Sequence, residues 1–348
     1  MDQKTLALIA AVATLVMSAC QSSTMLAPTS TSQTSVDYHA AFHRAVQAHY
    51  ADAAQLHDPH GLKTLGVMRE QIIAEFGKAQ YDEWLNHAIT EVCLVKTENG
   101  WAGAYVLQPD LPALPSCGVE PNAHFTAELI LGMVWNDLTE FRRPGWQEEL
   151  VIPRADLVYW LQRHIAIDDW SPGMETQALI AGGVPLTETW QTVDGRTWSI
   201  PTLLDAVIVR WRENRDKAAL QQGDIVPENM LHFAPALIEL LEQYPGTLST
   251  YRPLLDEVFA TYKSTLHPDG YWGFPGETFS TGHIVEQYIM AQRAGVSIEL
   301  PSLHPVELMV KYQRQDGWFD IHDNPFIGSQ SHGVRALGLT LPLLIQSP

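Results

Sequence analysis

Apolar residues recur at three- and four-residue spacing along most of the chain beyond Asp37, whereas strictly alternating apolar and polar positions are scarce. Such spacing places apolar side chains along one face of a helix. It predicts helices in AAFHRAVQAHYADAA, EQIIAEFGKAQYDEWLNHAI, ADLVYWLQRHI, SIPTLLDAVIVRWREN, FAPALIELLEQY, YRPLLDEVFATYKSTL and HPVELMVKYQRQ. The pattern therefore indicates an all-α protein.

The predicted helices follow a repeat of about fifty residues. Each longer amphipathic helix leads into a loop that contains Trp with Gly or Asp, and a second helix rich in small and aliphatic residues then begins. If the second helices are aligned on His124, Glu175, His232, His283 and His332, the separations are 51, 57, 51 and 49 residues. A period of this length is typical of helix pairs that stack or close into a ring.

Five such pairs and a further helix at 37–56 make about eleven helices, which favours six helical hairpins closed into an (α/α)6 toroid. Small residues suit an inner ring, where backbones crowd, and charged residues suit an outer ring that faces water. An open solenoid of helix pairs is the alternative. Because no linker interrupts the chain after residue 37, we expect one domain over 37–348.

The start of the chain has a different character. An apolar run from Thr5 to Met17 follows Lys4 and ends in VMSAC, which is the basic start, apolar centre and small-residue end of a secretory signal. The run is too short to cross a bilayer comfortably. VMSAC resembles the bacterial lipoprotein signal, which implies removal of residues 1–19 and acylation of Cys20. An ordinary signal peptide that ends in Cys is the alternative.

The segment 20–36 is rich in Ser and Thr and almost uncharged, as expected of a flexible tether. Gln21 rather than Asp follows Cys20, and by analogy with lipoproteins this favours anchoring in the outer membrane. The compartment would then be oxidising, and a disulfide between Cys93 and Cys117 is expected there. Two buried thiols are the alternative.

Composition restricts the partners and cofactors. The chain has 21 basic and 40 acidic residues and a net charge of −19, so its surface repels phosphate backbones and we expect no nucleic-acid partner. No HExxH, GxGxxG, GxxxxGK[ST] or GxSxG pattern is present. Turn capping explains the cluster of Asp320, His322 and Asp323 more simply than metal binding. We therefore expect no metal and no cofactor.

In a closed ring the N-termini of the inner helices converge at one mouth, which favours anionic ligands. The Trp-containing loops would line that mouth, and flat aromatic faces beside carboxylates suit a sugar ring. Trp170, Trp272 and Trp318 are therefore expected to stack on sugar rings, with packing in the core as the alternative for each.

Asp168 and Asp169 precede one inner helix, where two neighbouring carboxylates can push their pKa values apart and keep one of them protonated as a general acid. Capping of the helix is the alternative. Among the histidines near inner-helix starts, His283 is the strongest catalytic candidate. Candidates for substrate binding are His232, Glu277 and His332, and Arg335 could bind an acidic group or pair with a core carboxylate.

The segments HFAPALIELLEQYP, HPDGYW, ETFSTGHIVEQYIMAQRAG and IDDWSPGMETQALIAGG resemble the six-hairpin glycosidases. The likeness covers roughly residues 165–345 and is greatest to the unsaturated glucuronyl and rhamnogalacturonyl hydrolases. It implies an (α/α)6 toroid in which Asp168 or Asp169 protonates the double bond of a 4,5-unsaturated uronic acid and activates water. The segment PENMLHF before His232 departs from the Arg-Gly-Asn-Gly-Trp pattern of those hydrolases.

The resemblance and the candidate residues together predict a glycoside hydrolase that acts on acidic, uronate-containing oligosaccharides. One alternative is a glycan-binding or assembly lipoprotein that has a toroid fold and no catalytic activity. Another is a polysaccharide lyase that uses a histidine and a tyrosine.

Overall fold

Helices form most of the described chain. The computed structural model describes residues 36–107, 116–144, 148–169, 171–319 and 327–345. The helices are α2 (Tyr38–Ala51), α3 (Ala53–His57), α4 (Pro59–Val67), α5 (Arg69–Phe76), α6 (Lys78–Glu91), α7 (Ala123–Trp135), α8 (Arg154–His164), α9 (Pro172–Ala181), α10 (Ile200–Ala218), α11 (Glu228–Leu231), α12 (Phe233–Gln243), α13 (Leu248–Thr265), α14 (Phe279–Arg293), α15 (His304–Lys311) and α16 (Ile327–Leu344). The prediction of a mostly helical protein is confirmed.

One compact unit spans residues 37–348. The predicted signal at 1–19, Cys20 and nearly all of the tether lie outside the described residues. Within the described part, no helix combines the length and the apolar character needed to cross a membrane.

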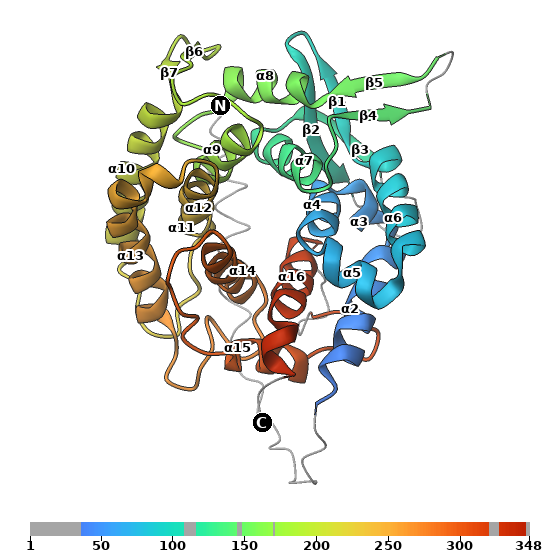
Figure 1. Cartoon of the computed structure of the whole chain (residues 1–348), viewed down its shortest axis with the longest axis vertical. Helices are drawn as coiled ribbons and strands as arrows, with labels where there is room; N and C mark the ends of the chain where they lie inside the picture. Colours follow the sequence, from blue (N-terminus) through green and yellow to red (C-terminus); the bar gives the residue numbers. More distant parts are fainter. Residues whose placement is uncertain (1–35, 108–115, 145–147, 170, 320–326, 346–348) are drawn as a thin grey trace, which may run out of the picture. The chain divides into compact units, whose positions relative to one another are not determined.

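Six helices pack one against the next in a closed series (Figure 1). Contacts run from α4 to α7, α9, α12, α14 and α16 in turn, and α16 packs back against α4. Helices α6, α8, α10 and α13 lie farther from the centre of the view. These outer helices are amphipathic: α10, for example, buries Leu203, Leu204, Val207 and Trp211 along one face. In contrast, every residue of α9 is buried.

Glycines allow the helices of the central series to approach closely. A Cβ atom added at Gly173 in α9 would lie 2.2 Å from the carbonyl oxygen of His232, and one added at Gly282 in α14 would lie 2.4 Å from the Cβ of His332. Any side chain at either position would force the two backbones apart. The small residues therefore set the spacing of neighbouring helices and, with it, the positions of two histidines.

Short strands interrupt the helical order, which the sequence analysis did not predict. Strands β1 (Leu94–Thr97), β2 (Gly100–Leu107) and β3 (Ser116–Pro121) form an antiparallel sheet in that order, and β2 packs against α7 and α8. The expected disulfide is present: Cys93, just before β1, is bonded to Cys117 in β3, with a Cα–Cα distance of 5.2 Å. The remaining strands form two small hairpins, β4 (Glu140–Arg143) with β5 (Leu150–Pro153) and β6 (Trp190–Gln191) with β7 (Thr197–Trp198).

Several helix predictions need correction. The helix expected over 37–56 is divided at Asp52 into α2 and α3. The segment EQIIAEFGKAQYDEWLNHAI forms two helices, α5 and α6, because Gly77 between them has a φ of 83°, in the left-handed region that glycine tolerates. The helix α4 was not predicted, although it belongs to the central series.

Candidate functional site

Five histidines lie side by side at the N-terminal ends of helices in the central series. His60 and His124 are in the first turns of α4 and α7, His232 directly precedes α12, and His283 and His332 are in the second turns of α14 and α16. In that order, the centroids of neighbouring rings are 5.6, 5.6, 5.0 and 3.5 Å apart, and His332 returns to within 6.0 Å of His60. We call these five residues the histidine cluster.

The remaining helix of the series, α9, contributes Ser171 and Glu175 at the equivalent place. The Ser171 hydroxyl lies 3.0 Å from Nδ1 of His124 and donates to Oε1 of Glu175 at 3.4 Å. All five residues used to align the sequence repeat, Glu175 among them, are therefore brought to one end of the central helices.

Hydrogen bonds fix the orientation of the remaining rings. Nδ1 of His283 donates to the Phe279 carbonyl at 2.9 Å, which leaves Nε2 to accept from Nε2 of His232 at 3.0 Å. Arg335 donates to Nδ1 of His332 at 2.5 Å. Nδ1 of His60 lies 2.6 Å from the Asp58 carboxylate and donates to it.

Burial lowers the pKa of His232 to about 3 and also lowers those of His124, His283 and His332 well below the ordinary value. These four rings are therefore neutral at neutral pH. His60 differs because Glu128 and Asp58 outweigh the effect of burial and raise its pKa.

Two buried ion pairs adjoin the cluster. Lys63 donates to Oε1 of Glu128 at 2.8 Å, and Arg335 donates from Nε to Glu286 at 2.8 Å. Burial alone would raise the pKa of Glu128, but Lys63 and His60 lower it far below the ordinary value. Among the described residues, no hydrogen-bond donor reaches Oε2 of Glu128.

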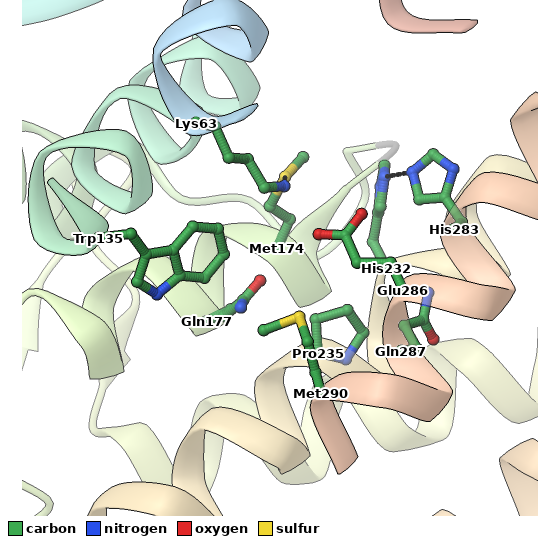
Figure 2. A pocket seen from close by; sticks show the side chains of 10 residues that line it. All are labelled: Lys63, Trp135, Met174, Gln177, His232, Pro235, His283, Glu286, Gln287 and Met290. Atoms are coloured by element: carbon green, nitrogen blue, oxygen red, sulfur yellow. Dashed lines mark hydrogen bonds between the residues drawn. The ribbon is translucent and has the colours of Figure 1, made fainter. Parts of the chain in front are cut away.

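A small cavity adjoins His232 and His283 of the cluster (Figure 2). Its lining residues are Lys63, Trp135, Met174, Gln177, His232, Pro235, His283, Glu286, Gln287 and Met290. Its volume of about 10 Å³ is close to the minimum that holds a single water molecule. A sugar ring could therefore bind only outside this cavity.

Aromatic side chains flank the histidine cluster. Phe125 contacts His124 with ring centroids 5.2 Å apart, and Tyr105, 45% exposed, packs against Phe125 at 4.6 Å. On another side, Phe279 lies 4.7 Å from His283. Tyr105 is the exposed ring of this group, whereas Phe125 is only 7% exposed.

The predicted aspartates lie at the start of α9. Asp168 is exposed and Asp169 is half-buried. Glu175 is completely buried, and burial together with the charge of Asp169 raises its pKa well above the ordinary value. The carboxylate pair in this segment is therefore Asp169 with Glu175, and Trp170 lies outside the described residues.

Two further candidates serve the fold. Trp272 is completely buried and donates from Nε1 to the Tyr262 carbonyl at 2.9 Å, so it has no exposed face for a sugar ring, and its expected stacking role is wrong. Glu277 accepts from backbone N–H groups at the start of α14, including that of Phe279 at 2.6 Å. Burial raises its pKa to about 7.

Trp318 is partly buried and lies in the connection between α15 and α16.

His60, Lys63 and Glu128 were not among the site residues predicted from the sequence. Two signals pointed to them: Asp58 followed by proline marks the start of a helix, and the four-residue spacing of His124 and Glu128 places both side chains on one face of α7. No protein-family model, curated protein or solved structure matches the chain.

Proposed function

We propose that the chain folds as an (α/α)6 toroid and that it is a glycoside hydrolase for acidic, uronate-containing oligosaccharides. Support for the toroid comes from the closed series of contacts among α4, α7, α9, α12, α14 and α16, with amphipathic helices outside it. Inner-helix N-termini at one end of such a ring favour an anionic ligand, because they present partial positive charge.

The observation that carries the proposed activity is the carboxylate pair at the start of α9. Asp169 is the member of the pair that solvent reaches, whereas Glu175 is buried behind it. We assign to Asp169 the transfer of a proton to the substrate and the activation of water, which are the tasks that hydrolysis of a glycosidic or unsaturated uronyl group requires. Glu175, whose pKa is raised by burial and by the charge of Asp169, is a positioning residue.

The volume of the small cavity beside His232 and His283 limits where the substrate binds. Because the cavity holds about one water molecule, the sugar ring would lie over the histidine cluster. There it would meet Tyr105 and Asp169, which combine an exposed aromatic ring with a carboxylate.

The test measures turnover of a panel of 4,5-unsaturated uronyl disaccharides. Turnover is monitored as the loss of the ultraviolet absorbance of their double bond. We expect Asp169→Asn to lower kcat by about 100-fold or more. The matched control is Asp168→Asn, which changes the exposed neighbouring carboxylate and should retain at least half of the activity. Melting temperatures establish that both variants fold. Full turnover by a folded Asp169→Asn variant would refute the assignment.

Binding without catalysis is the second candidate, and it is favoured by the hydrogen bond between the neutral rings of His232 and His283, which occupies groups that could otherwise transfer protons. Saturable binding of the same disaccharides with no product would support this candidate. An increase in the ultraviolet absorbance with saturated uronate polymers would instead identify a lyase.

We also propose that Cys20 is acylated and tethers the protein to the outer membrane. The proposal rests on the VMSAC sequence and on the segment that follows it. Cells that express the full chain should incorporate labelled palmitate into it, and Cys20→Ser should abolish that label and release the protein from the membrane fraction. Labelling that survives the substitution would refute the proposal.

A further inference from the structure

Two histidines and a glutamate of the site form a compact group of possible metal ligands. One ligand atom from each of His60, His124 and Glu128 lies within 4.8 Å of the others. The three residues are 8%, 2% and 1% exposed. His124 and Glu128 come from one face of α7, and His60 comes from the neighbouring helix α4.

The surroundings of both imidazoles have the form found around metal-bound histidines. Nδ1 of His60 donates to the Asp58 carboxylate at 2.6 Å, and Nδ1 of His124 lies 3.0 Å from the Ser171 hydroxyl. Groups of this kind hold a metal-ligating ring in orientation through the nitrogen that does not bind the ion. In both rings the arrangement assigns Nε2 to the ligand position.

The carboxylate of Glu128 supplies an independent observation. Lys63 occupies only Oε1, at 2.8 Å, and Oε2 is buried with no hydrogen-bond partner among the described residues. A buried acceptor without a partner is costly. A cation beside Oε2 would remove that cost.

We propose that His60, His124 and Glu128 bind a divalent transition-metal ion, with zinc as the best match. Two imidazoles and one carboxylate are a ligand set that zinc takes in proteins, with a fourth position left for water or another ligand. The competing explanation is that the three residues and Lys63 form only an internal network of charged hydrogen bonds.

The experiment uses the full chain without a histidine tag, stripped with a chelator. Titration with Zn²⁺ in a calorimeter should show one ion per chain, and substitution by Co²⁺ should give a visible absorption band of a low-coordinate site. We expect Glu128→Gln to weaken Zn²⁺ binding by about 100-fold or more, since outer groups alone contribute 10–100-fold. His304→Gln is the matched control, because His304 is exposed on α15 and should leave the affinity unchanged.

A second variant separates metal binding from damage to the fold. Lys63→Met removes the ammonium group from Oε1 and leaves the three ligands in place, so its loss of thermal stability should be reversed by Zn²⁺. The proposal is overturned if the full chain binds no stoichiometric ion, if Glu128→Gln leaves the affinity unchanged, or if Zn²⁺ does not restore the melting temperature of Lys63→Met. None of these measurements depends on turnover, so their failure is distinct from failure of the proposed hydrolysis.

Discussion

Glu239 in α12 makes the stability of the protein depend on pH. Its carboxyl is buried, Gln243 donates to Oε1 at 3.0 Å, and Oε2 has no hydrogen-bond partner among the described residues. Burial raises its pKa from 4.5 to about 7. Because the folded-state pKa lies above the unfolded value, the stabilisation by the neutral form is complete below the unfolded pKa and is lost as the pH rises through about 7.

The substitution Glu239→Gln keeps the shape of the neutral side chain and removes its titration. Ionisation costs about 1.36 kcal/mol for each pH unit between the unfolded and folded pKa values, which amounts to about 3 kcal/mol here. The variant should therefore gain less than about 1 kcal/mol over the parent protein at about pH 5, and about 3 kcal/mol at about pH 8.5.

Urea unfolding of both proteins, followed by tryptophan fluorescence at several pH values, measures this difference. Glu242→Gln is the matched control, because its exposed carboxylate lies three residues further along the same helix and should alter stability by less than about 0.5 kcal/mol. If the stability difference between Glu239→Gln and the parent protein is the same at every pH, ionisation of Glu239 does not destabilise the folded protein.

Three further substitutions test the packing of the central helices and the disulfide, each by the free energy of unfolding. Gly282→Ala places a Cβ 2.4 Å from the Cβ of His332 and should lower the free energy of unfolding by about 1–3 kcal/mol or more. The control Gly246→Ala, where the added Cβ meets open space, should lower it by less than about 0.5 kcal/mol. Equal losses in the two variants would contradict the close approach of the helices at Gly282. Arg335→Met leaves a buried carboxylate unpaired and should cost about 3–5 kcal/mol, against about 1 kcal/mol or less for Arg252→Met in an exposed pair. Cys93→Ser removes a disulfide that spans 24 residues and should lower the free energy of unfolding by about 3 kcal/mol. A reductant should destabilise the parent protein but not this variant, and destabilisation of the variant would show that the reductant acts elsewhere.

The helices and the repeat were predictable because both arise from local patterns. Apolar periodicity identified most helices, and the histidine and glutamate anchors identified equivalent places in five inner helices. The first helix of the central series was not predicted because α4 is short, at nine residues. His60 also precedes His124 by 64 residues, since the sheet β1–β3 is inserted between their helices and breaks the period.

The partners of the buried charges could not be predicted from the sequence. Lys63 and Glu128 are 65 residues apart and belong to different helices, so their contact depends on how α4 and α7 pack. Likewise, nothing local distinguishes Asp168 from Asp169. Their different exposure follows from the path of the chain into α9, and the buried partner of Asp169 is visible only in three dimensions.

The position of α16 has a consequence for how the protein is made. This last helix packs against α2, α4 and α14, and its Arg335 donates to Thr64, which is 271 residues earlier, at 2.9 Å. During synthesis, the faces of α2 and α4 that contact α16 therefore remain uncovered until α16 has been made. Long-range contacts of this kind slow folding and prolong the exposure of apolar surface. Among the described helices, α2 would wait longest for this partner, because it is made first.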